Sequence, residues 1–248
     1  INGDEEVSSA GSRELITRLG TEHDAVFSCE GGGASDRLAL TTAGIGAVLL
    51  RVRGRASHAG SAPEQGRNAL YELAHQVLQM RDLTNANAGI KLNWTIASAG
   101  ATRNVIPAVA RATADFRVLR VAAYDEVERL VRARIREQLI DGTTVDVSFE
   151  RRRPPLEATN ESRALAAHAQ SIYRELDRRL TVSDQAAGGG TDAAFAALES
   201  DAPVIEGFGL IGFGAHSDAR ESVDLRSVVP RLYLLTRMVM DVGQGLTP

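Results

Sequence analysis

Carboxylate side chains near the beginning of this 248-residue chain are the first candidates for chemistry, because they stand where a divalent metal could bind. Three of them are consecutive, from Asp4 to Glu6, and Glu30 follows directly after the apolar segment 25–29. A lone carboxylate at the end of an apolar strand is poorly placed unless another group pairs with it, and open α/β sheets form their binding sites at the carboxyl ends of strands. We therefore expect Glu30 to belong to a metal site, although the acidic triplet taken alone is more typical of a solvated chain end.

Two of the five histidines lie in glycine-containing segments that would expose them. His216 lies in the loop 212–218, between a predicted strand and the last predicted helix, and loops of this kind bring side chains to a site. His58 lies among small residues in the segment 54–60, at the end of another predicted strand. We expect His216 to be a metal ligand and His58 to be accessible. The remaining histidines, expected to have structural roles, are His23, His75 and His168.

A glycine-rich turn at residues 188–192 precedes a predicted helix. Its backbone N–H groups could bind an anion such as a carboxylate. A turn of this composition is equally typical of a connection between a strand and a helix that binds no ligand, so both interpretations stay open on the sequence pattern.

The composition excludes several other classes of protein. Cys29 is the single cysteine, which excludes an internal disulfide framework and a cysteine-based zinc cluster, so a metal would need His, Asp and Glu ligands. The 28 basic and 32 acidic residues give a net charge of −4, which argues against nucleic acid as the main partner. No stretch approaches about 18 uninterrupted apolar residues, so we expect no membrane-spanning helix. The first residues show no signal peptide, and the compartment, cytoplasmic or periplasmic, stays open.

The elements expected between residues 43 and 153 follow the order of a ferredoxin-like split βαβ unit. Alternating segments predict strands, and apolar residues spaced three and four apart predict helices. The predicted elements are a strand at 44–58, a helix at 67–81, strands at 90–97 and 104–118, a helix at 124–140 and a strand at 144–150. The basic and proline-containing run 151–155 is expected to be the exit linker.

The segments on either side of this unit are expected to form one α/β domain. The pattern predicts a helix at 9–19 and a strand at 25–29 before the unit, and after it a helix at 161–179, a strand at 180–185, a helix at 191–200, a strand at 202–209 and a helix at 227–243. This alternation indicates a mostly parallel sheet covered by helices. The expected fold is an α/β domain interrupted by an inserted ferredoxin-like (βαββαβ) domain, with the chain divided into residues 1–42, 43–153 and 154–248.

Seven motifs resemble those of the co-catalytic zinc aminoacylase and carboxypeptidase family, which includes bacterial glutamate carboxypeptidase, acetylornithine deacetylase and succinyl-diaminopimelate desuccinylase. In chain order they are DEEVSSAGSRELI, FSCEGG, GRASHAGSAPEQGRNAL, NWTIASAG, RNVIPAVARATADFR, GGGTDAAFAAL and GFGAHSD. They cover essentially the whole chain, and the resemblance is greatest to glutamate carboxypeptidase. The resemblance implies a zinc-binding α/β domain with an inserted dimerisation lid.

The resemblance also implies a role for individual side chains. Glu5 matches the general acid/base, Glu6 and His216 match ligands of one zinc ion, and Glu30 matches a ligand of the second zinc ion of an intact subunit. His58 matches a lid histidine that reaches the partner subunit's active site and stabilises the oxyanion. The residues implied to bind substrate are Asn104 and Arg117 in the lid, for a free carboxylate, and Gly189, Gly190 and Thr191, which line the pocket.

The chain departs from the family pattern in its metal ligands. Two of the five protein ligands that the family uses, a histidine in an H-x-D motif and a bridging aspartate, lie upstream of the DEE motif and have no counterpart in this sequence. The chain therefore resembles the C-terminal three-fifths of such an enzyme. We expect its zinc site to be incomplete and the chain alone to be inactive.

The function implied by the resemblance is that of a zinc-dependent metallopeptidase that dimerises through its lid. It would hydrolyse an amide bond in a peptide or an N-acyl or folate-like substrate and release a C-terminal amino acid, with glutamate as the expected one. One alternative is an N-acyl amino acid deacylase of the acetylornithine or succinyl-diaminopimelate type. Another, for this chain alone, is a non-catalytic dimerisation module. Neither nucleic acid nor a membrane is an expected partner.

Overall fold

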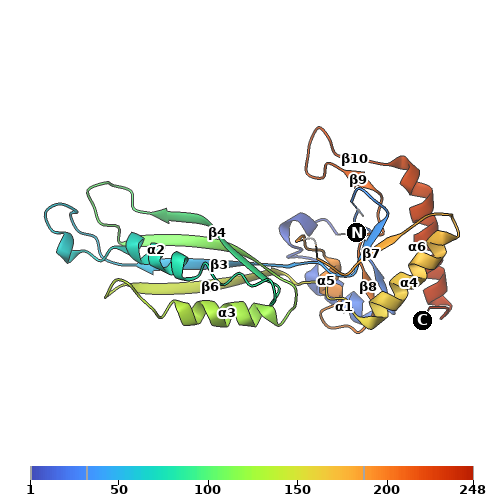
Figure 1. Ribbon diagram of the computed structural model, residues 1–248, viewed down its shortest axis with the longest axis horizontal. Helices are drawn as coiled ribbons and strands as arrows, with labels where there is room; N and C mark the ends of the chain where they lie inside the picture. Colours follow the sequence, from blue (N-terminus) through green and yellow to red (C-terminus); the bar gives the residue numbers. More distant parts are fainter. Residues whose placement is uncertain (1, 32, 187, 248) are drawn as a thin grey trace. The chain divides into compact units, whose positions relative to one another are not determined.

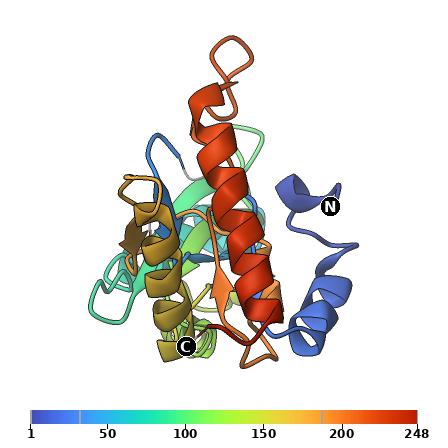
Figure 2. The same cartoon turned by 90° about the vertical axis from the view of Figure 1, so that its right-hand side faces the viewer.

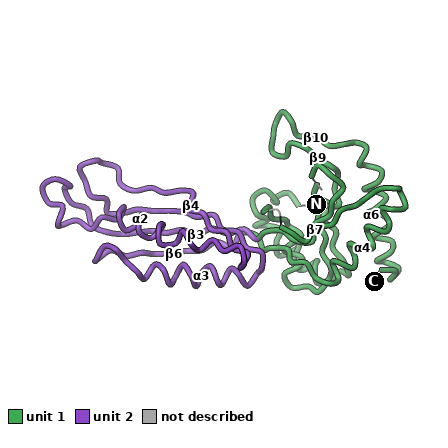
Figure 3. Tube along the Cα trace, in the orientation of Figure 1, with its two compact units in different colours: residues 1–43, 153–248 green, residues 44–152 purple. Residues whose placement is uncertain are grey.

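The computed structural model describes residues 2–31, 33–186 and 188–247, and the chain divides into two compact units (Figure 3). Unit 1 comprises Ile1–Ala43 and Arg153–Pro248, and unit 2 comprises Gly44–Arg152. The sequence predicts boundaries after residues 42 and 153. Within the described ranges, no helix is both long and apolar enough to cross a membrane.

Unit 2 has the strand and helix order of the inserted domain that the sequence predicts (Figure 1). Its elements are β3 (Gly44–Arg53), α2 (Ala69–Gln79), β4 (Ile90–Ala99), β5 (Val109–Val118), α3 (Ala123–Arg134) and β6 (Thr144–Arg153). They form one four-stranded sheet in the order β4-β5-β3-β6, in which β3 and β5 pair antiparallel, as do β4 and β5. This βαββαβ arrangement confirms the predicted fold class for the inserted part of the chain.

One face of this sheet carries the core of unit 2. Even-numbered residues of β3 and β5 are buried, because successive side chains of a strand point to opposite faces. Examples are Val48 and Val52 on β3 and Phe116 on β5, each fully buried. The same cluster includes Leu73 of α2 and Val131 and Tyr124 of α3, so both helices cover the same face. The odd-numbered residues of β5 therefore lie on the face opposite to the helices.

Unit 1 contains short parallel strand pairs covered by helices. Its strands are β1 (Val26–Phe27), β2 (Arg37–Ala39), β7 (Thr181–Ser183), β8 (Val204–Ile205), β9 (Gly212–Phe213) and β10 (Ser222–Val223). Its helices are α1 (Arg13–Glu22), α4 (Asn160–Arg174), α5 (Ala193–Ala196) and α6 (Val228–Gly243). β1 pairs parallel with β8 and β2 pairs parallel with β7, whereas β9 and β10 form an antiparallel pair. The parallel pairs between distant segments confirm the predicted α/β class.

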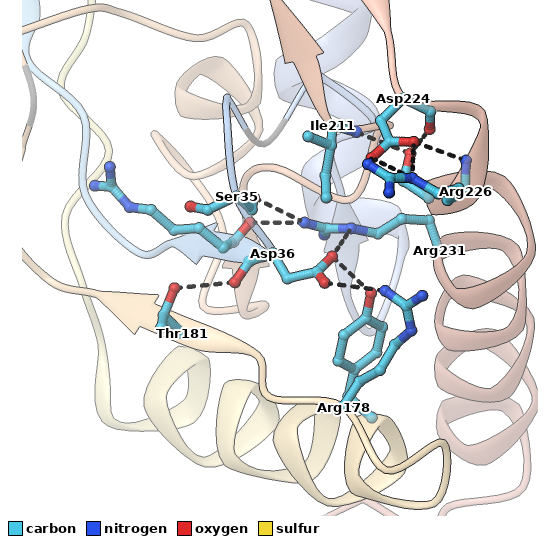
Figure 4. A network of polar contacts seen from close by, with 11 residues as sticks. Ser35, Asp36, Arg178, Thr181, Ile211, Asp224, Arg226 and Arg231 are labelled. Atoms are coloured by element: carbon cyan, nitrogen blue, oxygen red, sulfur yellow. Dashed lines mark hydrogen bonds and ion pairs between the residues drawn. The ribbon is translucent and has the colours of Figure 1, made fainter.

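The two long helices of unit 1, α4 and α6, run next to each other over its main core (Figure 2). Arg231 of α6 is 2% exposed, and its Nε lies 3.3 Å from an oxygen of Asp36. The hydroxyl of Tyr173 on α4 donates to the same carboxylate at 2.6 Å, and Arg178 lies 3.5 Å from it (Figure 4). Burial raises the pKa of Tyr173 to about 12, so this hydroxyl stays a donor at neutral pH. A buried charge requires such partners, and this network ties the segment before β2 to both helices.

Several predicted elements are wrong in extent. The basic run 151–153 is not a linker but the end of β6, where Arg151 pairs with Asp125 and Glu128 and Arg153 is buried. The strand predicted from residue 104 begins at Val109, because the proline-containing segment before it cannot supply every ladder hydrogen bond. The helix predicted at 191–200 contains only the four residues of α5. The short strands β2, β9 and β10 were not predicted, because two or three residues show no periodicity.

Candidate functional site

Asp4 organises the segment that carries Glu5 and Glu6. Its carboxylate accepts hydrogen bonds from the backbone N–H of Gly11 at 2.7 Å and from the hydroxyl of Ser12 at 2.6 Å. These two contacts, the Ser12 hydroxyl foremost, lower the pKa of Asp4. The oxygens of Asp4 are therefore occupied locally, which makes this residue a structural member of the acidic triplet.

The helix predicted to begin at residue 9 begins at Arg13, because the chain turns sharply before it. Ser8 and Ser9 have φ angles of 69° and 54°, in the left-handed region that ends regular structure for side-chain-bearing residues. A single 3-10 turn, Glu5–Val7, precedes them. The two adjacent glutamates thus lie on a short turn whose position depends on contacts with the rest of unit 1.

Glu5 lies in a partly buried position beside two charged residues from distant parts of unit 1. One carboxylate oxygen is 2.5 Å from Nη1 of Arg153, whose side chain is 8% exposed. Arg153 also lies 3.5 Å from Asp192. Burial raises the pKa of Glu5, Arg153 opposes the increase, and the negative charges of Asp192, Glu30 and Glu6 add to it. A carboxyl group with a raised pKa suits a proton-transfer role.

Glu6 and His216 meet although they come from opposite ends of the chain. Nδ1 of His216 lies 3.8 Å from a carboxylate oxygen of Glu6, and both side chains are 77% exposed. His216 lies between β9 and β10 with a φ angle of 63°, two residues after Gly214, whose φ angle is 67°. The left-handed backbone of this loop thus presents the imidazole at an exposed position next to the acidic turn.

Glu30 lies just beyond β1, at the edge where strand β8 also ends. Its backbone carbonyl accepts a hydrogen bond from the N–H of Gly209 at 2.9 Å. A Cβ atom at position 209 would collide with the backbone carbonyls of Cys29 and Glu30, so glycine is required for this close approach. The side chain of Glu30 is exposed, and its charge contributes to the raised pKa of Glu5 and of Glu206.

Two side chains of types that can bind a metal, Glu6 and His216, lie near each other among the described residues. Two donors at about 2.0–2.1 Å from one tetrahedral ion are roughly 3.3 Å apart. The separation of Glu6 from His216, 3.8 Å, is somewhat longer than this value. Among residues 2–31, 33–186 and 188–247, however, no three His, Cys, Asp or Glu side chains form a group that could hold a metal ion. The donor types, a carboxylate and an imidazole, are among those that bind zinc.

The glycine-rich loop lies beside Glu206, a buried carboxylate that sequence reasoning missed. Thr191 is 2% exposed and its hydroxyl donates to Glu206. Burial raises the pKa of Glu206, and hydrogen bonds from the hydroxyls of Thr191 and Ser28 oppose the increase. Gly189 is exposed and Gly190 half-buried, so these two can line a pocket, whereas the Thr191 side chain is directed into the protein. Glu206 follows an apolar strand, the same signal that identifies Glu30.

In unit 2, His58 and Asn104 lie next to each other in an extension of the β3–β5 ladder. His58 bridges to Val105, and the carbonyl of Asn104 accepts from the N–H of Ala59 at 2.9 Å. Nδ1 of His58 accepts hydrogen bonds from the N–H groups of Gly60 and Ser61 at 3.2 and 3.1 Å. An accepting Nδ1 carries no proton, so in neutral His58 the proton is on Nε2, which makes Nε2 a hydrogen-bond donor.

Arg117 lies at the opposite end of the same sheet. It pairs in register with Ile45 at the start of β3, whereas Val109, at the other end of β5, pairs with Arg53. The eight residue steps from Val109 to Arg117 span about 27 Å of strand. Arg117 also makes a bidentate contact with Asp115, at 2.8 and 2.9 Å. Unit 2 therefore does not bring Arg117 together with Asn104, and the two cannot bind one carboxylate from the same chain.

Comparisons with known proteins place these features in a family context. Residues 40–143 match the family model described as a peptidase dimerisation domain. The chain is 42% identical over 246 residues to carboxypeptidase G2 from Pseudomonas sp. (strain RS-16), a match that covers 99% of this chain. It spans 59% of the length of that relative.

Solved structures with low sequence identity share the fold. The aminopeptidase PepT from Bacillus cereus superposes with a TM-score of 0.79 at 18% identity, covering 97% of this chain and 62% of that chain. The YxeP protein of Bacillus subtilis, described as a dinuclear metal-binding peptidase of the M20 family, superposes with a TM-score of 0.72 at 14% identity, covering 96% and 62%. The sequence matches confirm the predicted resemblance to the aminoacylase and carboxypeptidase family. The solved structures confirm the predicted α/β fold with an inserted domain.

Proposed function

We propose that the complete protein is a metal-dependent hydrolase that cleaves an amide bond and releases a C-terminal amino acid, glutamate in particular. The observation that carries this proposal is the meeting of Glu6 with His216, 3.8 Å apart, beside Glu5 with its raised pKa. Nearly the whole chain is similar to carboxypeptidase G2, whose name describes a carboxypeptidase. The similarity and the geometry support the same reaction class.

In this proposal, the residues of unit 1 bind the metal ions and transfer the proton. Glu6 and His216 would hold one zinc ion and Glu30 a second, with further ligands needed to complete both. The bound metal would supply Lewis acidity and a water of lowered pKa. Glu5, which is partly buried beside Arg153, takes a proton from the attacking water and returns it to the leaving amine. Its raised pKa allows it to hold that proton between the two steps.

The residues of unit 2 serve substrate binding and charge stabilisation. The Nε2–H of His58 is a donor for the oxyanion, and a single donor of this kind contributes about 3–4 kcal/mol to a transition state. Because His58 and Asn104 lie at one end of the sheet and Arg117 at the other, we assign them to two different active sites of a dimer. Arg117, with its planar guanidinium, binds the free carboxylate of the substrate bidentately in one site.

A homodimer through unit 2 is supported by its exposed apolar surface. β4 is an edge strand, and its residue Ile96 is 64% exposed. Helix α2 exposes Tyr71 and Leu78 at 61% and 63%. Unpaired strand edges and apolar side chains are typical of surfaces that another chain covers. We propose that a second copy covers them.

A pair of neighbouring substitutions tests the catalytic assignment in the complete enzyme. Glu5→Gln keeps the size of the side chain but cannot accept a proton, so kcat should fall by about 10²–10⁴-fold while KM and zinc content stay nearly unchanged. Glu6→Gln removes a charged ligand, so zinc content should fall and added zinc should partly restore activity. The measurements are hydrolysis of a glutamate-terminated amide and zinc analysis after dialysis.

The same measurements separate the alternatives. Loss of metal in Glu5→Gln but not in Glu6→Gln would show that Glu5 is the metal ligand and Glu6 the acid/base. Unchanged activity in both variants would show that neither glutamate takes part in catalysis and that the acidic turn is only solvated. Faster hydrolysis of an N-acetyl or N-succinyl amino acid than of a peptide-like glutamate amide would identify a deacylase. A complete protein that retains no zinc would favour a non-catalytic dimerisation module.

A further inference from the structure

Two charged residues outside the proposed metal ligands contact the turn that carries Glu5 and Glu6. Arg153 contacts Glu5 twice: Nη1 lies 2.5 Å from the carboxylate, and Nη2 donates to the backbone carbonyl. Asp192 contacts the same segment on both sides of the turn, because its two oxygens accept from the side chains of Ser9 and Asn2. Arg153 and Asp192 lie 3.5 Å apart, so the four contacts form one connected group.

Both residues lie on structure that is firmly anchored. Arg153 ends the ten-residue strand β6, and Asp192 immediately precedes α5, whose four residues are all buried. Their side chains are 8% and 15% exposed. Ser9 is fully buried. The turn at residues 4–9, by contrast, has one 3-10 turn and two left-handed residues. A short irregular segment keeps its position only through contacts of this kind.

We propose that Arg153 and Asp192 are positioning residues that fix the turn at residues 4–9, and so orient the Glu5 carboxylate relative to Glu6. The catalytic part of this proposal rests on the proposed function, whereas the structural part does not. A guanidinium group is needed at position 153, because its several N–H donors contact the carboxylate of Glu5, the backbone carbonyl of Glu5 and the carboxylate of Asp192 at the same time. A lysine keeps the charge but has one nitrogen and cannot span these three oxygens.

The chain itself tests the structural part by amide hydrogen exchange. The N–H groups of Val7, Ser8 and Ser9 all donate within the turn, so they report its opening. In Arg153→Lys and in Asp192→Asn, we expect their exchange to accelerate about tenfold or more, the factor expected for the loss of a charge-assisted hydrogen bond. Arg152→Lys is the matched control, because Arg152 directly precedes Arg153 on β6 but is exposed and pairs with Glu150.

Amides of α4 serve as the internal reference for the stability of unit 1. The proposal requires that they exchange at the parent rate while the turn amides accelerate. Parent-rate exchange of the turn in both Arg153→Lys and Asp192→Asn would overturn it. Equal acceleration in the turn and in α4 in both variants would overturn it as well, since the two residues would then stabilise the whole unit and not the turn.

The complete enzyme tests the catalytic part. Arg153→Lys should lower kcat by about tenfold or more with KM and zinc content unchanged, since the acid/base is misplaced while substrate and metal contacts remain. Arg152→Lys should leave kcat at the parent value. If Glu5→Gln proves fully active, the proposed function fails, and the exchange experiment still decides whether the turn is held by Arg153 and Asp192. If Glu5→Gln is inactive but Arg153→Lys is not, only the positioning role fails.

Discussion

The buried carboxylate of Glu206 connects the strand that leads to Glu30 with the glycine-rich loop. The carboxylate accepts hydrogen bonds from the hydroxyls of Thr191 and of Ser28, which follows β1, and the backbone N–H of Glu206 donates to the carbonyl of Ala39 at 3.0 Å. A buried carboxylate is stable only when such donors surround it. Burial still dominates, because the pKa of Glu206 is raised despite these hydrogen bonds. Residue-level electrostatics thus make this side chain a source of pH dependence in unit 1.

Glu206→Gln should reduce the loss of unfolding free energy that occurs as the pH rises. A carboxyl group whose pKa is raised in the folded state contributes stability that is fully present below its unfolded pKa and is lost as the pH rises through its folded pKa. The loss of unfolding free energy therefore begins near pH 4.5, the ordinary pKa of a glutamate, and grows as the pH rises further. Urea unfolding of the chain at pH 4.5 and pH 7.5 should show a smaller difference in unfolding free energy for Glu206→Gln than for the parent. Glu14→Gln, an exposed position, is the control; an equal pH difference in Glu206→Gln and the parent would contradict the assignment.

Among the elements of unit 1, the short strands are held in place by close contacts between their backbones, because they are too short to form a long ladder of hydrogen bonds. β1 and β8 each contain two residues, and the pairing is extended beyond them by the N–H of Phe208 donating to Ser28 and that of Gly209 donating to Glu30. The sequence predicts both strands from their apolar runs, but a strand of two residues is too short to reveal its partner. The approach at Gly209 is what sets the position of Glu30.

Gly209→Ala should destabilise unit 1, because the added methyl group would collide with the backbone of Cys29 and Glu30. Overpacking of this kind costs about 1–3 kcal/mol, measurable as a lower urea midpoint. The control is Gly243→Ala at the end of α6, where nothing lies within 4 Å of the added atom. This control should be neutral or slightly stabilising. Equal midpoints for the two variants would show that the strand end tolerates displacement.

For the whole molecule, the proposed dimer depends on apolar surface that a single chain leaves exposed in unit 2. Unit 2 has the more extensive sheet, and its edge strand β4 exposes Ile96. Natural proteins protect such edges with charge or with another chain. The match of residues 40–143 to a peptidase dimerisation domain agrees with coverage of this edge by another chain.

Ile96→Lys should shift the chain from dimer to monomer. A charge placed on the proposed interface would be desolvated without a partner, which should raise the dissociation constant by about tenfold or more. Sedimentation velocity over a range of micromolar concentrations measures the change. Leu225→Lys in unit 1, where the leucine is 75% exposed, is the control and should leave the dimer intact. A parent chain that is monomeric at high micromolar concentration would contradict the proposed assembly.

Sequence alone determined the class of fold and the main candidates for chemistry. The ten-residue strands and amphipathic helices of unit 2 are long enough for their periodicity to be read, and the observed order βαββαβ confirms that interpretation. Glu6 and His216 were identified from motifs at opposite ends of the chain, and the structure brings them within 3.8 Å. The strands and helices depend on local pattern, which the sequence carries directly, whereas the role of Glu6 is implied by the resemblance of its motif to a known family.

Tertiary structure alone decided which polar groups become partners. Arg153, in a run that the sequence interprets as a solvated linker, is buried against Glu5 and Asp192, residues more than 30 positions away from it. The separation of Asn104 from Arg117 follows from the register of β3 with β5. Such contacts join segments that share no local pattern, and their strength comes from burial, which only the packed chain creates.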